Sequence, residues 1–430
     1  MSIKYAEAGN RGSRVRSDCW IGLRLTGSSG IKLNFKSKVD VLYGESTREL
    51  IRDILKFYAI ENAEVEVEDA GAVPYVMMAR VETALRRLKL DKGKRYLPDR
   101  QYPVESSTRE RFRRSRLYLP GDQPKLSMNA AIHKPDGMIL DLEDSVAPAN
   151  KDAARILVRN ALRSIDFMGA ERMVRINQLP LGFADLEEIV PQKPHLLLIP
   201  KVETAEQVQE IEKKVNEILA AQKNDKTKQK FFGGPGGDFS KKPPGRRRQE
   251  EDLFFMPIIE SGLGVINAYS IAKASPRNVA LAIGLEDYTA DLGVQRTNEG
   301  RESFFARSML VNAARAAGIQ AIDTVFSDVN DMDALRESVL EAKSLGFDGK
   351  GAIHPRQIPV IHEAFAPAEK EIEKAEKIVL AFEEAEKKGL GVVSLGSKMI
   401  DPPVVKRALK TINMAVREGI LPENWRTENE

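Results

Sequence analysis

The chain has little of what disulfide-rich, zinc-binding or membrane proteins need. Its 430 residues include one cysteine, Cys19, and four histidines. This excludes an internal disulfide and a cysteine-cluster metal site, and it leaves little scope for zinc. No apolar run approaches the roughly 18 residues of a membrane helix, and the N-terminal segment lacks the apolar core of a signal peptide. We therefore predict a cytoplasmic protein with no membrane partner.

A strong charge of one sign is also missing. The 66 basic and 63 acidic side chains leave a net charge of +3, so the surface as a whole predicts no nucleic-acid partner. Apolar material, in contrast, is plentiful, because 42% of the residues are hydrophobic. A chain of this length can bury the core of one barrel-sized domain and of a smaller second domain.

Residues 1–90 have the pattern of a small α+β domain. Strand-like runs at 19–25 and 31–35 flank the turn at 27–30, which predicts a β-hairpin. Apolar periodicity predicts the remaining elements, a helix over 46–58, a strand over 64–68 and a helix over 73–88. Residues 91–115 are polar and broken by prolines, and we interpret them as a linker.

Residues 116–365 repeat one unit, a short apolar run followed by a segment that can form a helix. The runs cover 116–119, 138–142, 173–176, 196–199, 254–259, 279–283, 321–325 and 352–353. Eight such units predict an α/β fold, a (β/α)8 TIM barrel, whose active site lies where the strands end. Residues 366–430 are predicted to form a C-terminal helical lid and oligomerisation segment.

Two of the strand ends carry carboxylates. Glu260 closes the run 254–259 and Asp287 follows the run 279–283, while 262–274 is interpreted as one crossover helix. Because the two strands of such a unit are often neighbours, both carboxylates would face one small volume. Hard oxygen ligands without Cys or His suit Mg²⁺. The alternative is that both acids only cap the helices that follow.

Other polar residues also fall at predicted strand ends. Arg175 could bind a carboxylate bidentately, or it could pair with a buried acid such as Glu143, and the sequence leaves both roles open. Lys201 is interpreted as a structural ion-pair partner of Glu203 or of a neighbour. The remaining strand-end residues are Pro120, Gly121, Asp144, Asp328, His354 and Pro355.

Several motifs in this order identify a family resemblance. They are RSRLYLPGDQPKL, MILDLEDSVAPANKDAAR, MVRINQ, LIPKVET, IIESGLG, IGLEDYTADLG, GFDGKGAIHPRQI and GLGVVSLGSKMIDPPVVKRA. From about residue 114 to 419 the chain resembles the citrate lyase beta subunit and the related HpcH/HpaI aldolases and acyl-CoA lyases. The resemblance implies that Glu260 and Asp287 hold Mg²⁺ and that Arg175 binds the substrate carboxylate.

The same resemblance implies the chemistry and the remaining assignments. The reaction would be a retro-Claisen cleavage of a 3-hydroxy-3-carboxy acyl thioester of the citryl-CoA type, giving oxaloacetate and an acetyl thioester. Malyl-CoA or citramalyl-CoA cleavage, or thioester hydrolysis, would need the same groups. We assign a catalytic role to Glu143 with Arg175, and substrate contacts to Pro120, Gly121, His354 and Pro355.

The C-terminal motif contributes one further catalytic assignment. Asp401 precedes Pro402 and Pro403 and would cap the helix that follows. In the resembling lyases this segment lies over the barrel of a neighbouring subunit, and its aspartate is a general acid or base. The resemblance transfers that role to Asp401 and implies a homo-oligomer, a trimer or a multiple of three.

The N-terminal domain contains the segments SDCWIGLRL and VEDAGAVPYVMMARVETALRRL. By these segments it resembles the acyl-carrier (gamma) subunit of citrate lyase. That family carries a phosphopantetheine-type arm on a serine two residues before an aspartate. Here Asp18 matches the aspartate, the serine position holds Arg16, and Ser17 is the nearest hydroxyl. The sequence therefore favours a domain that has lost its arm and serves packing or oligomer contacts over a working carrier.

The segment 222–252, rich in Gly, Pro and Arg, interrupts the barrel pattern. A surface loop is the favoured interpretation, and a phosphate site for coenzyme A formed by Arg246, Arg247 and Arg248 is the alternative. At the level of the whole chain, a scaffold that joins a citrate lyase alpha (transferase) subunit is the alternative to an enzyme.

Overall fold

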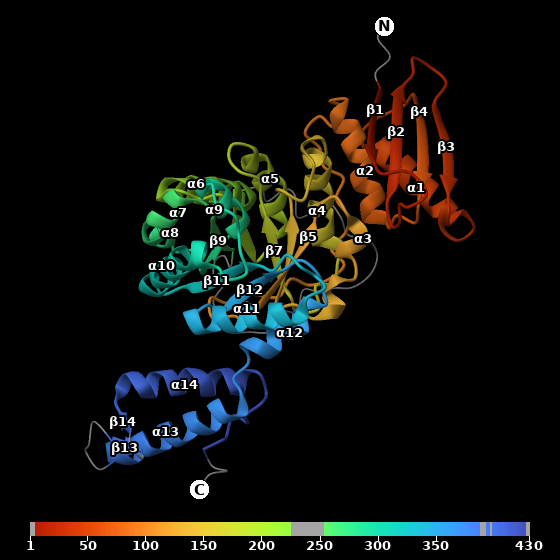
Figure 1. The fold of residues 1–430 in the computed structure, drawn as a ribbon. Helices are drawn as coiled ribbons and strands as arrows, with labels where there is room; N and C mark the ends of the chain where they lie inside the picture. Colours follow the sequence, from red (N-terminus) through yellow and green to blue (C-terminus); the bar gives the residue numbers. More distant parts are fainter. Residues whose placement is uncertain (1–4, 225–252, 388–392, 396–397, 427–430) are drawn as a thin grey trace.

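The computed structural model describes residues 5–224, 253–387, 393–395 and 398–426. It contains an N-terminal domain, a central barrel and a pair of C-terminal helices (Figure 1). The predicted loop or phosphate site at 222–252 falls almost entirely outside the described residues. None of the helices that the structure describes combines the length and the apolarity of a membrane span.

The N-terminal domain contains a four-stranded sheet with two helices. In spatial order the strands are β1 (Tyr5–Gly9), β2 (Cys19–Leu25), β4 (Ala63–Asp69) and β3 (Ile31–Ser37), and the helices are α1 (Asp40–Phe57) and α2 (Pro74–Arg87). The predicted hairpin is wrong, because β4 lies between β2 and β3, antiparallel to the first and parallel to the second. Val65 and Val67 of β4 are fully or almost fully buried. The central position of β4 in the sheet is consistent with this burial.

The barrel is closed and parallel, which confirms the predicted fold class. Its strands follow one another in sequence order, and the last pairs with the first. The strands are β5 (Ser115–Pro120), β6 (Gly137–Asp141), β7 (Glu171–Arg175), β8 (Leu196–Ile199), β9 (Phe254–Ile259), β10 (Ala280–Ile283), β11 (Gln320–Val325) and β12 (Gly349–Ala352).

Helices cover the barrel from outside. They are α3 (Pro124–Ser127), α4 (Lys151–Ser164), α5 (Leu181–Ile189), α6 (Ala205–Asn224), α7 (Gly262–Ile266), α8 (Ala268–Lys273), α9 (Leu285–Leu292), α10 (Arg301–Ala317), α11 (Met332–Leu345) and α12 (Gln357–Phe365), with 3₁₀ turns η1 (Ala130–His133), η2 (Pro148–Asn150) and η3 (Val190–Gln192). The single crossover helix predicted over 262–274 is wrong in detail. It is divided into α7 and α8 at Asn267, whose side-chain amide donates to the backbone oxygen of Glu203.

Helix α2 joins the N-terminal domain to the barrel because it is buried on two faces. Met77, Val81 and Leu85 belong to the core of the N-terminal domain, whereas Val76 and Ala79 belong to the core that the barrel shares with its helices. An amphipathic helix normally buries one face only. The second face therefore makes the N-terminal domain a packed part of the barrel, beside α4 (Figure 1).

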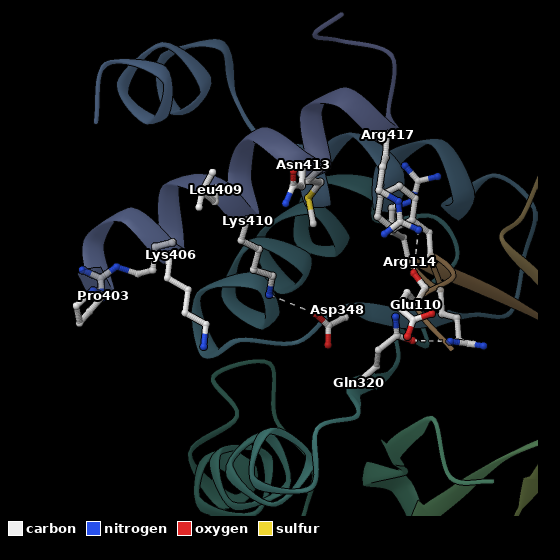
Figure 2. Close-up of a pocket in the computed structure, with 14 residues that line it drawn as sticks. Glu110, Arg114, Gln320, Asp348, Pro403, Lys406, Leu409, Lys410, Asn413 and Arg417 are labelled. Carbon is white, nitrogen blue, oxygen red and sulfur yellow. Dashed lines mark hydrogen bonds and ion pairs between the residues drawn. The ribbon is translucent and has the colours of Figure 1, made fainter. Parts of the chain in front are cut away.

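The C-terminal segment has a small core of its own. It consists of α13 (Glu369–Lys387), β13 (Val393–Leu395), β14 (Lys398–Ile400) and α14 (Pro402–Arg417). Val379 and Phe382 of α13 pack with Val405 and Ile412 of α14. The other face of α14 is polar and lines a cavity of about 720 Å³ against the barrel (Figure 2).

Contacts across this cavity place α14 at one end of the barrel. Lys410 lies 3.5 Å from Asp348, and Arg417 stacks on Phe112. Because residues 112 and 348 come just before β5 and β12, α14 covers the amino ends of its own barrel strands. That end is opposite to the one at which the predicted site residues lie.

Candidate active site

A cavity of about 350 Å³ opens at the carboxyl ends of the barrel strands. We call it the barrel cavity. Of the predicted site residues, Pro120, Arg175, Glu260 and Asp287 line it, and they come from β5, β7, β9 and the start of α9. Active sites of TIM barrels lie at this end, and the volume suits a small ligand.

Glu260 is the most perturbed acid of the barrel cavity. Glu260 follows β9 and is 6% exposed. Its carboxylate accepts a hydrogen bond from the backbone N–H of Lys201 at 2.9 Å. Burial, with smaller contributions from the charges of Glu143 and Asp287, raises the pKa of Glu260 to about 8. Gly284, the residue after β10, leaves room for this carboxylate, because a Cβ there would lie 2.4 Å from Oε1 of Glu260 and would displace the side chain.

Arg175 is held by acids from the neighbouring strand. Its Nε and Nη2 donate to the two oxygens of Asp141 at 2.7 Å each, and Nη1 lies 2.9 Å from Glu143. Burial alone would lower the pKa of Arg175, but these contacts, Asp141 foremost, raise it. The guanidinium also lies 5.2 Å from the ring centroid of Tyr118. The ion pair with Glu143 is therefore present, and it fixes the orientation that a carboxylate ligand would meet.

Lys201 points at the acids of the site. Its Nζ lies 3.3 Å from Asp287, 3.6 Å from Glu143 and 3.7 Å from Asp144. The predicted ion-pair role is therefore present, but Glu203 is not the partner, since it accepts a hydrogen bond from the Ser261 hydroxyl. Lys201 has a φ of 49°, and this left-handed turn lets its N–H reach Glu260 while its side chain reaches the acids.

The donor set fits a magnesium ion. Within the described residues, no three Asp, Glu, His or Cys side chains are grouped as a ready-made metal cage. Mg²⁺ does not need one, because it is usually bound by one or two carboxylates together with water and substrate oxygens. Glu260 and Asp287 supply two such carboxylates on one cavity wall. A divalent cation between them would favour the ionised form of Glu260.

The remaining predicted residues lie next to the barrel cavity or away from it. Gly121 lies behind the wall, where its N–H donates to the Asp141 backbone oxygen at 2.8 Å. On the β12 side the cavity is lined by Ile353, and His354 and Pro355 follow it in the chain.

Asp401 caps α14, as its Oδ1 accepts the N–H of Val404 at 3.1 Å. Because α14 covers the amino ends of the strands, Asp401 does not enter the cavity of its own chain.

Sequence reasoning missed three residues of the cavity wall. Arg116 and Tyr118 alternate with Leu117 and Leu119 on β5, so they face the barrel interior while the leucines face the helices. Asp141 is the acid that holds Arg175. The alternation of apolar and polar residues in RLYLP was the available signal for Arg116 and Tyr118, and the position of Asp141 as the last residue of β6 was the signal for the third.

Comparisons with known proteins establish the family. The model of the HpcH/HpaI aldolase/citrate lyase family matches residues 114–355, more than half of the chain. The chain therefore belongs to this family, and the predicted class of carbon–carbon lyase is confirmed. The acyl-carrier family described as malonate decarboxylase delta subunit (MdcD) matches residues 4–88.

Individual relatives agree with this membership. The chain is 39% identical over 308 residues to the citrate lyase subunit beta of Leuconostoc mesenteroides, covering 71% of this chain and 94% of that one. It is 32% identical to the mitochondrial citramalyl-CoA lyase of Rattus norvegicus, covering 70% and 86%. Among solved structures, the CitE protein of Mycobacterium tuberculosis in complex with magnesium, acetoacetate and coenzyme A has a TM-score of 0.55 and 28% identity, covering 72% and 99%.

Proposed function

We propose that the chain cleaves a citryl-CoA-type thioester, a 3-hydroxy-3-carboxy acyl thioester, into an oxoacid and an acetyl thioester. The observation that carries the proposal is the convergence of Glu260, Asp287 and Arg175 on the barrel cavity. Two carboxylates suit a divalent cation, and a fixed guanidinium suits the carboxylate of an oxoacid. The relatives named above, lyases and a protein bound to magnesium and coenzyme A, support the same substrate class.

Glu260 and Asp287 would hold Mg²⁺. When bound, Mg²⁺ supplies positive charge to the hydroxyl and carboxylate oxygens of the substrate. Arg175 then holds the substrate carboxylate in place, and its stacking on Tyr118 limits its motion. Lys201, within 4 Å of three acids, balances the negative charge of the site.

Two carboxyl groups would move the protons. Burial raises the pKa of Glu143 above its usual value, which makes this carboxylate a stronger base for the substrate hydroxyl proton. The electron pair left on that oxygen forms the carbonyl of the oxoacid, the carbon–carbon bond breaks, and the thioester becomes an enolate. We assign the protonation of the enolate carbon to Asp401 of a neighbouring subunit, because Asp401 lies outside the cavity of its own chain.

Substrate cleavage tests the proposal directly. The purified protein is incubated with citryl-CoA, malyl-CoA and citramalyl-CoA, with Mg²⁺ and with excess chelator, and release of the oxoacid is measured. We expect cleavage that requires Mg²⁺ and is fastest with citryl-CoA. Release of free coenzyme A without an oxoacid would instead identify a thioesterase, and no reaction with any thioester would leave the scaffold alternative. The cytoplasmic location and the trimeric assembly stay predictions.

A further inference from the structure

Arg116 is a buried cation that has no carboxylate partner among the residues that the structure describes. It precedes Tyr118 by two residues on β5, is 1% exposed and lines the inner part of the barrel cavity. Its Nη1 contacts the sulfur of Met256 at 3.1 Å and its Nη2 reaches the backbone oxygen of Asp323 at 3.4 Å, whereas its Nε has no acceptor in the described part of the chain. A thioether is a weak acceptor, and buried charges are normally paired because an unpaired charge is costly.

The nearest acid is already occupied. The Asp323 carboxylate accepts from Lys350 at 2.8 Å and from Arg307 at 3.1 and 3.2 Å, and all three residues are buried. The Asp323 carboxylate therefore already binds two other cations, Lys350 and Arg307. Burial, without a counter-charge of its own, lowers the pKa of Arg116.

The other nearby acids do not supply the missing charge. Glu341 lies 2.7 Å from Arg307 on the outer side, and Glu171 forms a closed pair with Arg113 in which both side chains are 0% exposed. Lys350 and Arg307 thus occupy the carboxylates of Asp323 and Glu341. With Arg116 beside them, the described residues of this cluster have three positive charges and two negative ones. The inner end of the barrel cavity carries one positive charge in excess.

The position of this excess charge fits an extended ligand. Tyr118 follows Arg116 on the same inward face of β5, about 7 Å further along the strand, and Arg175 stacks on its ring. The cavity wall thus carries a guanidinium at two successive levels. An oxoacid with one carboxylate can satisfy only one of them, whereas a dicarboxylate can satisfy both.

We propose that Arg116 binds a second carboxylate of the substrate, so that the chain selects thioesters whose oxoacid half is a dicarboxylate of the oxaloacetate type over those that yield glyoxylate or pyruvate. This inference rests on the proposed lyase function. A ligand without the second carboxylate leaves a desolvated cation unpaired, and sites built for a polar group reject analogues that lack it. The inference thereby explains why a buried arginine stands in the wall without a protein counter-ion.

The replacement Arg116→Met tests the proposal, because methionine fills similar space without charge. Binding of oxaloacetate, pyruvate and glyoxylate to the Mg²⁺-loaded protein is measured by calorimetry, and kcat/KM is measured with citryl-CoA and citramalyl-CoA. We expect at least a 100-fold loss of oxaloacetate affinity and of kcat/KM for citryl-CoA, on the order expected when one partner of a buried charge pair is removed. The values for pyruvate and citramalyl-CoA should change by less than about threefold. Arg116→Lys should recover part of the dicarboxylate preference.

Stability separates a binding role from a structural one. Loss of a buried charge that has no protein partner should leave the melting temperature unchanged or raise it, whereas a drop of several degrees would identify Arg116 as a structural residue and overturn the proposal. Equal loss of oxaloacetate and pyruvate binding would also overturn it. If no thioester is cleaved but oxaloacetate binding depends on Arg116, the proposed lyase function fails and the carboxylate site stands. If citryl-CoA is cleaved equally well by Arg116→Met, the carboxylate site fails and the lyase function stands.

Discussion

The contact between the N-terminal domain and the barrel contains a buried ion pair whose removal should be costly. Glu82 of α2 and Arg159 of α4 are both 0% exposed and form two hydrogen bonds of 2.8 Å. Replacing Arg159 by methionine removes the positive charge and leaves the carboxylate buried. Breaking a buried pair in this way typically costs about 3–5 kcal/mol. Arg86, 2.7 Å from Glu82, remains as a partner, so we expect a cost of about 3 kcal/mol.

This cost should be visible as a shift of the melting temperature. At about 2.1 cal/mol/K per residue, a cooperative unit of about 400 residues has an unfolding entropy of about 0.8 kcal/mol/K. A cost of about 3 kcal/mol should therefore lower the melting temperature of Arg159→Met by about 3–4 °C. The double variant with Glu82→Leu removes both charges of this pair and should recover part of the loss, since an apolar replacement of a buried pair is often neutral. The recovery is incomplete because Glu188, 3.1 Å from Arg159, also loses a partner and keeps only Arg86 and Arg95. Melting is followed by circular dichroism and calorimetry. We expect one transition, because α2 contributes to both cores.

An exposed ion pair provides the matched control. Lys214 and Glu187 lie 2.8 Å apart with side chains 28% and 52% exposed, so Lys214→Met should cost less than about 1 kcal/mol. If Arg159→Met melts like Lys214→Met, the reasoning from burial is refuted. Two separate transitions in the unmodified protein would show instead that the N-terminal domain unfolds independently of the barrel.

Three further outcomes follow from the site and the interface. Burial favours the neutral form of Glu188, but Arg159 and the other guanidinium groups around it hold its pKa at about 2 instead of 4.5. This contribution to stability, about 3 kcal/mol, should be complete above pH 4.5 and lost as the pH falls towards 2. The melting temperature of Glu188→Gln should therefore change less between pH 4.5 and pH 2 than that of the unmodified protein. Asp287→Ala should abolish Mg²⁺-dependent cleavage without lowering the melting temperature. The control Asp291→Ala, on the same helix, should keep both the cleavage activity and the melting temperature of the unmodified protein. Chelator-resistant turnover by Asp287→Ala would argue against the metal assignment. Verified mixed oligomers of Asp401→Asn and Arg175→Ala should regain activity, and their failure to do so would contradict a lid that crosses between subunits.

The barrel could be predicted because its signal is local and repeated. Each strand is a short apolar run, and each functional residue at its end is marked by the change from apolar to polar character, as at Glu260 and Arg175. The pairing of β2 and β3 could not be predicted in the same way, because a short turn between two apolar runs also occurs when a third strand lies between them. The order depends on the pairing of β4 with both β2 and β3, which buries Val65 and Val67 on a central strand.

Partners of charged side chains were the hardest feature to predict. Lys201 is two residues from Glu203, yet a left-handed turn directs it to acids that are 58 and 86 residues distant in the chain. The sequence shows Arg116 at the start of an apolar run, where a solvent-exposed cation would look the same. Its burial without a counter-ion depends on which acids the closed barrel brings to that level, and Asp323 comes from the seventh of eight strands.

The contacts that fix the N-terminal domain to the barrel bear on whether this domain could act as a carrier, since Arg16 stands where the carrier family has its serine. Arg80 donates to both oxygens of Asp18 at 2.9 and 2.8 Å and also to the backbone oxygen of Asp122 at 3.2 Å, so the segment that holds Arg16 and Ser17 is tied to the loop that follows β5. A carrier arm serves several active sites only if its domain can move between them, and a domain held by buried ion pairs cannot. An arm at this place would serve only the barrel to which the domain is packed, and the proposed cleavage of a free coenzyme A thioester would not require one. The arginine at the serine position and the buried interface thus favour the same conclusion, that this domain acts in packing and no longer as a mobile carrier.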